Sequence, residues 1–336
     1  MSIATDSRPM LELKDVSKRF VKRLDSAARI GNWFGAGLKE EVVRAVDGVT
    51  LRIAAGEVVG LVGESGCGKS TLGRMAVGLH TLDAGTRTYQ GTDLATLSAR
   101  EARAAQLKIQ MIFQDPYASL NPRMRVQDIV GEAPVVHGLI KRGEQQDYVE
   151  KLLAQVGLDA SLTRRFPHQF SGGQRARIGI ARALAVKPEF MVCDEAVAAL
   201  DVSIQAQVLN LFIDLREQLG LTYLFISHDL GVVRHLSDRV LIMYLGRIVE
   251  SAPTDAIYAS PNHTYTQALL AEIPSLEKRK RTYIPIKGEI PSPLNPPPGC
   301  HFHPRCPRAF ERCKVEDPAL REIAPGRLSA CHLNDQ

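Results

Sequence analysis

A nine-residue loop rich in glycine, GESGCGKST at residues 63–71, most constrains how this chain can fold. A strand expected at residues 57–62 precedes the loop, and a helical pattern at residues 71–79 follows it. Glycines let such a loop turn tightly and aim its backbone N–H groups at phosphate oxygens. The order of strand, loop and helix therefore predicts an α/β sheet with a phosphate-binding loop at the end of one strand.

The loop residues have separate expected roles. Lys69 supplies a positive charge to the β- and γ-phosphates of a nucleotide, and Ser70 can place its hydroxyl on Mg²⁺. ATP and Mg²⁺ are the expected ligands. The nucleotide-binding residues expected here are Gly63, Ser65, Gly66, Cys67, Gly68, Lys69, Ser70 and Thr71.

A second apolar run, residues 190–193, ends in Asp194 and Glu195. Such a run is typical of a parallel strand buried on both faces, so its two carboxylates are expected at the carboxyl edge of the sheet, where ligands bind. Asp194 can hold Mg²⁺, usually through its water, because this hard cation prefers oxygen ligands. Glu195 points differently and can polarise an attacking water, which predicts ATP hydrolysis.

The remaining motifs resemble the motif set of ATP-binding-cassette (ABC) ATPases: FQDPYASLNPR around Gln114, SGGQ at residues 171–174, Leu200-Asp201 and His228. The resemblance covers roughly residues 10 to 255. It implies that Gln114 contacts Mg²⁺ and reports the nucleotide state to a transmembrane partner. It also implies that Asp201 acts across a dimer and that His228 contacts the γ-phosphate. Phe20 matches the aromatic residue that stacks on adenine, with an ordinary core position as the alternative.

SGGQ consists of Ser171, Gly172, Gly173 and Gln174, and it precedes a helix expected from about residue 174 to 186. A helix N-terminus carries partial positive charge and free N–H groups, which suit a γ-phosphate. In the family that the chain resembles, this phosphate belongs to ATP on the other subunit. The resemblance therefore implies a dimer bridged by ATP, and a second, different ABC ATPase subunit is the expected partner.

FQDPYASLNPR and residues 199–211 and 227–240 look similar to ATPases of dipeptide and oligopeptide importers. Nickel, opine and oligosaccharide importers use related ATPases, so these cargoes stay open. The family implies two transmembrane permeases, an extracytoplasmic substrate-binding protein, and a peripheral location on the cytoplasmic face of the inner membrane. The chain departs from the family at Ala196 and Ala198, where Pro and Ser are common. Losing the Ser hydroxyl removes one possible hydrogen bond at the dimer seam, worth about 1 kcal/mol.

Composition agrees with this interpretation. Apolar residues make up 45% and charged residues 24% of 336, as in ordinary globular proteins. The sequence lacks an apolar stretch near the ~18 to 20 residues that cross a bilayer, and its start lacks a secretory pattern. A nucleic-acid-associated ABC ATPase is a distant alternative, because long coiled coils or a second cassette are missing; no nucleic acid is expected as a partner. The retained catalytic groups argue against a purely structural or redox-regulatory protein.

We predict an α/β P-loop NTPase cassette with a mixed sheet core, an antiparallel β subdomain and an inserted helical subdomain at about 116–188. The nucleotide-binding domain spans 1–255, and a small Cys-rich C-terminal extension spans 256–336. An insert between Phe20 and Val43 contains Trp33, for which packing on its own domain is favoured over a membrane interface. A basic run at residues 278–281 is interpreted as a solvated linker.

Four of the six cysteines lie in the extension: Cys300, Cys306, Cys313 and Cys331. In a reducing cytoplasm such clustering indicates a metal rather than disulfides. Four thiolates satisfy zinc or a four-iron cluster, and the lack of close C-x2-C pairs makes a zinc ribbon less natural. PSPLNPPPGC and HPRC resemble the extension of peptide and nickel importer ATPases, some of which hold a 4Fe-4S cluster. A 4Fe-4S cluster is therefore the expected cofactor, with Zn²⁺ or free thiols as alternatives.

Overall fold

The computed structural model describes residues 8–22, 32–33, 40–272 and 288–335. The basic run at 278–281 lies outside these ranges, as does most of the insert before Val43. Trp33 has 86% of its surface exposed, and its packing on its own domain stays a prediction. In the described part of the chain, no helix is long and apolar enough to cross a bilayer.

An antiparallel sheet is built from the N-terminal strands in the order β2-β1-β4-β5. Their bounds are β1 Leu11–Lys22, β2 Glu41–Ile53, β4 Ala84–Tyr89 and β5 Thr92–Asp93. Leu11 and Leu13 of β1 are fully buried, whereas Glu12 between them is only partly so. This alternation gives the sheet one apolar face, which packs on the rest of the cassette.

The central sheet has the strand order β11-β12-β10-β9-β3-β8-β7-β6 among the described residues. Its parallel strands are β3 Val58–Val62, β6 Ile109–Ile112, β7 Phe190–Asp194, β8 Thr222–Ser227 and β9 Arg239–Tyr244. Antiparallel strands complete one edge: β10 Arg247–Pro253, β11 Arg321–Ala324 and β12 Arg327–Ser329. The predicted mixed sheet core and antiparallel β subdomain are both present.

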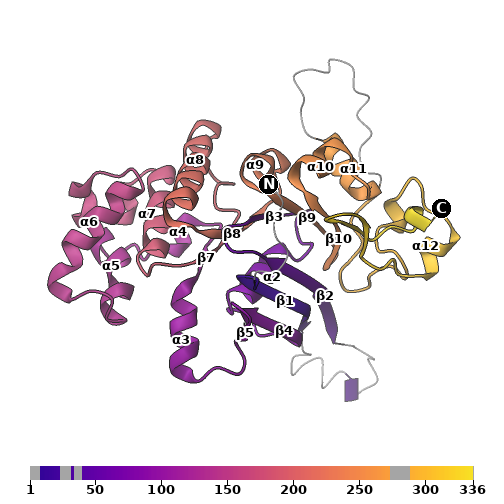
Figure 1. Ribbon diagram of the computed structural model, residues 1–336, viewed down its shortest axis with the longest axis horizontal. Helices are drawn as coiled ribbons and strands as arrows, with labels where there is room; N and C mark the ends of the chain where they lie inside the picture. The colour runs from indigo at the N-terminus through magenta and orange to yellow at the C-terminus, as the bar shows by residue number, and fades with distance from the viewer. Residues whose placement is uncertain (1–7, 23–31, 34–39, 273–287, 336) are drawn as a thin grey trace.

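Helices cover both faces of this sheet (Figure 1). Alternate residues of β8 show the two layers: Tyr223 and Phe225 pack in one apolar cluster with α8 and α9, while Leu224 and Ile226 pack in another with α2. Such burial on both faces explains why the parallel strands read as unbroken apolar runs. The helices here are α2 Lys69–Ala76, α3 Ala99–Lys108, α8 Val202–Leu219, α9 Leu230–Leu236, α10 Thr254–Ala259 and α11 Thr264–Ala271.

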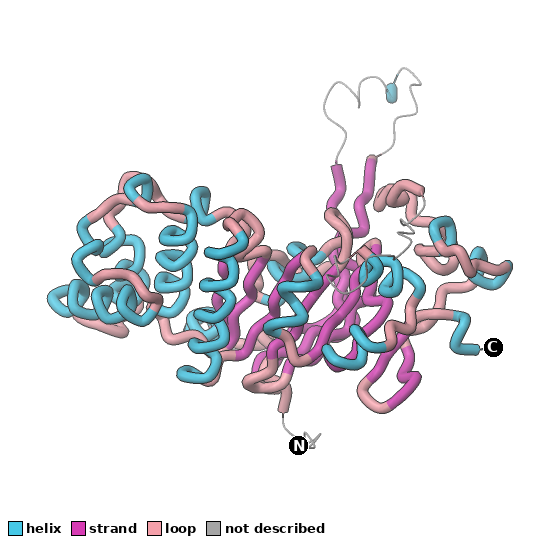
Figure 2. Tube along the Cα trace, turned by 90° about the horizontal axis from the view of Figure 1, so that it is seen from above, coloured by secondary structure: helices cyan, strands magenta, loops and turns pink. Residues whose placement is uncertain are grey.

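A group of helices lies at the β6 end of the molecule (Figures 1 and 2). Its members are α4 Pro116–Ser119, α5 Val126–Val136, α6 Gln145–Gln155 and α7 Gly172–Leu184. This is where the helical subdomain is expected, although α7 begins and ends two residues before its expected bounds.

The C-terminal extension joins the central sheet. β12 pairs with β10, with Glu250 opposite Ser329, and β11 pairs with β12. Phe302 is 1% exposed and belongs to the main apolar cluster. The extension also contains the short helix α12 Glu311–Val315. Strand pairing and apolar packing therefore hold the extension in place. From the sequence, a metal cluster was expected to do this.

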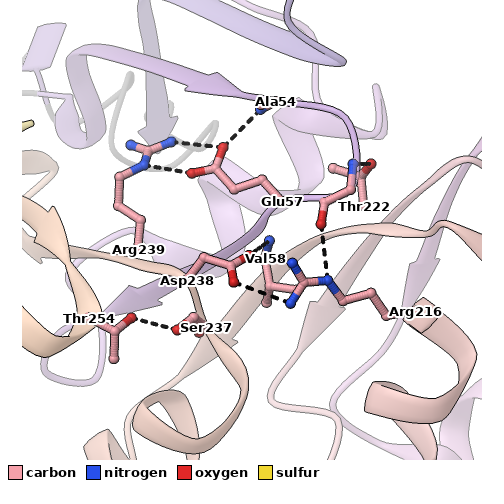
Figure 3. A network of polar contacts seen from close by, with 10 residues as sticks. Ala54, Glu57, Val58, Arg216, Thr222, Ser237, Asp238, Arg239 and Thr254 are labelled. Atoms are coloured by element: carbon pink, nitrogen blue, oxygen red, sulfur yellow. Dashed lines mark hydrogen bonds and ion pairs between the residues drawn. The ribbon is translucent and has the colours of Figure 1, made fainter. Parts of the chain in front are cut away.

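Ion pairs and hydrogen bonds close the edge of the sheet where the parallel strands begin (Figure 3). Asp238 accepts from the Val58 backbone N–H at 2.8 Å and from Arg216 Nη2 at 2.6 Å. Arg239 Nε donates to Glu57 Oε1 at 2.7 Å. These contacts fix the amino ends of β3 and β9, and the opposite edge, where the same strands end, carries the glycine-rich loop.

Candidate nucleotide-binding site

The glycine-rich loop connects β3 to α2 along a path that only glycine can follow at several points. Gly66 and Gly68 have φ of 79° and 110°, in the left-handed region. A Cβ at Gly68 would lie 2.1 Å from the Ala45 carbonyl oxygen, and one at Gly63 would lie 2.2 Å from that of Met243. The glycines therefore allow both the turn and its close contact with β2 and β9.

Lys69 begins α2 with its side chain turned back into the loop. Its ammonium donates to the carbonyl oxygens of Gly63 at 2.7 Å and Glu64 at 2.9 Å, and the residue is 4% exposed. The same ring of loop atoms includes Cys67, whose Sγ lies 3.9 Å from the ammonium. Burial raises the pKa of the Cys67 thiol, so this cysteine stays neutral. The loop therefore presents one positive charge where phosphate oxygens are expected.

Ser70 and Asp194 come together as the sequence predicts. The Ser70 hydroxyl donates to Asp194 Oδ1 at 2.8 Å, and Asp194 is 2% exposed. Burial raises the pKa of the Asp194 carboxyl above its ordinary value, while the hydrogen bond from Ser70 opposes that rise. A hydroxyl beside a carboxylate is an oxygen donor set that fits Mg²⁺.

Three further predicted side chains meet at the ends of β6, β7 and β8. Gln114 Nε2 donates to Glu195 Oε2 at 2.8 Å, and His228 Nδ1 lies 3.4 Å from the same oxygen. Glu195 has φ of 48°, a strained conformation for a residue with a Cβ. Its backbone N–H donates to the Ile226 carbonyl oxygen of β8 at 3.0 Å. The backbone thus turns Glu195 away from Asp194 and towards Gln114 and His228.

SGGQ forms the start of α7 and is held by a capping box. Ser171 Oγ accepts from the Gln174 N–H at 3.3 Å, and Gln174 Oε1 accepts from the Ser171 N–H at 3.0 Å. α7 packs against α4, α5, α6 and α8, whereas α2 packs against β1, β2, β7 and β8. SGGQ and the glycine-rich loop therefore begin helices that pack against different parts of the fold.

Asp201 and Phe20 lie at two other edges of the cassette. Asp201 precedes α8 with an exposed side chain that makes no capping hydrogen bond to the helix. The Phe20 ring is 40% exposed, with its centroid 5.5 Å from that of His80 in an edge-to-face contact. Lys18 Nζ lies 5.9 Å from the ring centroid. Stacking of Phe20 on adenine stays a prediction, as do the other residue roles.

A hollow lies beside Gln114, where β6 meets the helical group. Its volume is about 340 Å³, and its lining includes Phe113, Ser119 and Arg182. The Arg182 guanidinium donates to the Ser119 carbonyl oxygen. The hollow thus joins the segment after Gln114 to α7, the helix that SGGQ begins.

Sequence reasoning missed two contacts of the loop. The Glu64 carboxylate pairs with Arg305, which is 241 positions away, and the Glu64 N–H donates to the Tyr265 hydroxyl. Neither contact follows a local motif or a periodic pattern, so only the folded chain reveals it.

The prediction of a 4Fe-4S cluster is wrong. The described ranges include Cys300, Cys306, Cys313 and Cys331, yet no three metal-ligating side chains within these ranges come together in a way that could hold a metal ion. Burial, with the neighbouring thiols, raises the pKa of Cys300 to about 12, and burial raises that of Cys331. Cys306 Sγ lies 3.2 Å from Thr264 Oγ1 instead. The Zn²⁺ alternative has no support for the same reasons, and all six cysteines are free thiols.

Comparisons with known proteins match this geometry. A family model described as ABC transporter matches residues 46–198, and one described as Oligopeptide/dipeptide transporter, C-terminal region, matches residues 249–313. The oligopeptide transport ATP-binding protein AppF of Bacillus subtilis is 50% identical over 334 residues, which cover 98% of this chain and 99% of that protein. The putative oligopeptide transport ATP-binding protein YkfD of the same organism is 53% identical over 304 residues, 89% and 92% of the two chains.

Solved structures show the same cassette. The dimeric post-hydrolysis state of the ATP-binding cassette MJ0796, bound to ADP and Pi, is similar to this chain with a TM-score of 0.61 and 26% identity. The similarity covers 73% of this chain and 99% of that one. The residues outside the similarity are about a quarter of the chain.

Proposed function

Because the chain belongs to the ABC family of peptide-transport ATP-binding proteins, we propose that it hydrolyses ATP to power the import of dipeptides or oligopeptides through a membrane transporter. The observation that carries the proposal is the meeting of Gln114, Glu195 and His228 beside the Ser70–Asp194 pair. Relatives named for oligopeptide transport, at about half identity along nearly the whole chain, supply the cargo class.

In the proposed reaction, Lys69 binds the β- and γ-phosphates, and Ser70, Asp194 and Gln114 would hold Mg²⁺. The ion supplies positive charge that offsets the charge developing on the phosphates. Glu195 orients and polarises the attacking water, because its carboxylate already accepts from Gln114 and lies beside His228. His228 contacts the γ-phosphate. Each of these groups reaches the site from the carboxyl end of a neighbouring strand or from the loop.

In the proposed dimer, one chain supplies the glycine-rich loop of one nucleotide site and the SGGQ segment of the other. SGGQ is separated from the loop within the chain, so we propose that Ser171 and its helix N-terminus complete the site of a second ABC ATPase subunit, with Asp201 at the seam. A different ATPase subunit is the proposed partner. Closure of such a dimer on ATP can move the hollow beside Gln114, where a permease helix would dock. The chain then works at the cytoplasmic face of the membrane with two permeases and a substrate-binding protein.

Replacing Glu195 tests the hydrolytic step. In the assembled transporter, Glu195→Gln should reduce ATP turnover by at least about 100-fold, the scale of general-base catalysis, while ATP binding persists. The variant should accumulate as a closed, ATP-bound dimer on size exclusion. Glu217→Gln, an exposed carboxylate near the end of α8, is the matched control and should keep wild-type turnover. Wild-type turnover by Glu195→Gln would refute the role of this residue.

Cargo is tested by uptake. A strain that lacks this gene should lose uptake of labelled dipeptides or oligopeptides and regain it with the wild-type gene but not with Glu195→Gln. Restored uptake of nickel, opines or oligosaccharides in place of peptides would replace the proposed cargo and leave the ATPase assignment intact.

A further inference from the structure

Glu64, the second residue of the glycine-rich loop, forms an ion pair with Arg305 of the C-terminal extension. Arg305 Nη1 donates to Glu64 Oε2 at 2.7 Å, and Arg305 Nη2 donates to Glu64 Oε1 at 2.9 Å. Arg305 is 7% exposed. Two parallel hydrogen bonds between a guanidinium and a carboxylate form a strong and directional ion pair, particularly where water is excluded. This pair joins two segments that lie 241 positions apart in the sequence.

The backbone of Glu64 is held as well. Its N–H donates to the hydroxyl of Tyr265 in α11 at 2.9 Å, and its carbonyl oxygen accepts from Lys69 Nζ at 2.9 Å. Tyr265 is fully buried. The side chain, the N–H and the carbonyl of Glu64 each have a defined partner, and two of these three partners follow β10. The position of this loop residue is thus set from outside the loop.

Aromatic packing makes these two partners rigid. The ring centroids of Tyr244 and Tyr265 are 4.7 Å apart, and Phe302 lies 5.3 Å from each. Arg305 Nη1 lies 3.4 Å from the Tyr244 hydroxyl oxygen, and its guanidinium lies 5.9 Å from that ring's centroid. Burial raises the pKa of both tyrosines, so their hydroxyls stay neutral in the physiological range. The cluster links β9, α11 and the extension into one support beneath the loop.

We propose that Arg305 and Tyr265 are positioning residues for ATP, which hold Glu64 so that the loop and Lys69 are set for phosphate binding. A loop whose N–H groups already point at the phosphates binds without the cost of ordering. The extension then tunes the ATP affinity of the same chain. The inference rests on the proposed ATP hydrolysis at this site.

The test uses the assembled transporter and compares Arg305→Gln with Arg312→Gln. Arg312 also lies in the extension, and it pairs with the carboxylates of Glu316 and Asp335, which belong to the extension as well. Arg305→Gln should raise KM for ATP and the Kd of a fluorescent ATP analogue by about tenfold, with kcat changed less than about threefold. Arg312→Gln should leave both constants unchanged.

Hydrogen exchange provides a readout that a merely structural role would not move. In the transporter without nucleotide, backbone amides of residues 63–68 should exchange at least about tenfold faster in Arg305→Gln, and β12 amides should exchange as in wild type. Arg305→Lys, which keeps the charge and loses the fork, should lie between the two. Equal acceleration in the loop and in β12 would show that Arg305 only anchors the extension and would overturn the proposal.

A second variant keeps the test decisive if Arg305→Gln fails to fold, since it leaves the partly buried Glu64 carboxylate without its cation. Glu64→Gln keeps the side-chain shape and removes the charge, and it should raise the ATP KM in the same direction. The positioning role alone would be refuted if Glu64→Gln bound ATP with unchanged affinity. In that case the wild-type transporter would still hydrolyse ATP, and Glu195→Gln would not. Absence of hydrolysis by the wild-type transporter would instead sink the proposed function.

Discussion

At the end of β7, folding places the carboxyl group of Asp194 where water barely reaches it. The side chain has one close hydrogen-bond donor, Ser70, at 2.8 Å, and burial still raises its pKa. A group that must be ionised to bind a cation therefore opposes folding in the nucleotide-free protein near neutral pH. This loss of stability falls on the residue that we propose as a Mg²⁺ ligand.

Asp194→Asn should separate the two effects. Because the folded state raises this pKa, the stabilising protonated form is fully present below the unfolded pKa and is lost as pH rises through the folded pKa. The variant should have a higher Tm than wild type at pH 7 without nucleotide, and a flatter dependence of Tm on pH above pH 4. Its Mg²⁺-dependent ATPase activity should fall by at least about 100-fold. Calorimetry across pH and a turnover assay measure both, and a lower Tm at pH 7 would contradict the stability argument.

Most of the site could be predicted from local sequence, for a physical reason. The carboxyl ends of parallel strands meet at one sheet edge, so the residues after β6, β7 and β8 are brought together wherever the strands are recognised. Gln114 and His228 were named from the resemblance to ABC ATPases, and the structure brings both side chains beside Glu195. The contact of Glu64 with Arg305 could not be predicted, since neither residue belongs to a periodic pattern and the contact depends on how the extension docks.

On the scale of elements, α7 begins at Gly172 because Ser171 supplies its N-cap. The apolar pattern of the sequence predicts this helix from about Gln174. Glycines are poor helix formers. The reciprocal hydrogen bonds of Ser171 and Gln174 compensate for that weakness and bring both glycines into the first turn. The helix therefore begins with two residues that carry no side chain, and a Cβ at Gly173 would lie 2.4 Å from Ile204 Cγ2.

Removing the N-cap of α7 should reduce ATP turnover more than removing the N-cap of another helix at the same cost in stability. Ser171→Ala should lower stability by about 1 kcal/mol and reduce ATP turnover of the assembled transporter severalfold. Ser98→Ala is the matched control, because Ser98 and Glu101 form the same capping box at the start of α3. Both variants should lose similar stability in urea titrations, but only Ser171→Ala should lose turnover. Equal turnover in the two would show that the cap has a structural role only.

The strands of the C-terminal extension are too short to be predicted from the sequence. β11 and β12 contain four and three residues, too few for a period-2 pattern to stand out from chance. Four clustered cysteines were the stronger signal and indicated a metal. Strand pairing with β10 and the burial of Phe302 supply the anchoring instead, and neither leaves a recognisable spacing in the sequence.

For the whole molecule, the two ends of the parallel strands of the central sheet serve different purposes. The edge where the parallel strands begin is closed by the Asp238 and Glu57 ion pairs (Figure 3), and the edge where they end carries the nucleotide loop. The hydrogen bonds at the two ends share no residue, so removing an ion pair at one end leaves the contacts of the loop in place. Stability at one edge and chemistry at the other can therefore vary separately.

Asp238→Ala should test that separation. It removes the acceptor of the Val58 N–H and of Arg216, so unfolding free energy should fall by about 1–3 kcal/mol. KM for ATP should stay within twofold of wild type. Asp214→Ala, an exposed carboxylate on α8, is the control and should change neither quantity. A Tm series with a steady-state assay is sufficient, and a tenfold rise in KM would show that the two edges are coupled.

The pairing of β10 with β12 implies that the nascent chain exposes a strand edge until its C-terminal residues are made. β10 is complete by residue 253, but the strand that covers its outer side is made of residues 327–329. At typical elongation rates of ~5–20 residues per second, roughly 4–15 s separate the two on the ribosome. During that interval, an uncovered strand edge can pair with another nascent chain. Messages cut short before residue 327 should therefore yield products that aggregate, even though every residue of the predicted nucleotide site has already been made.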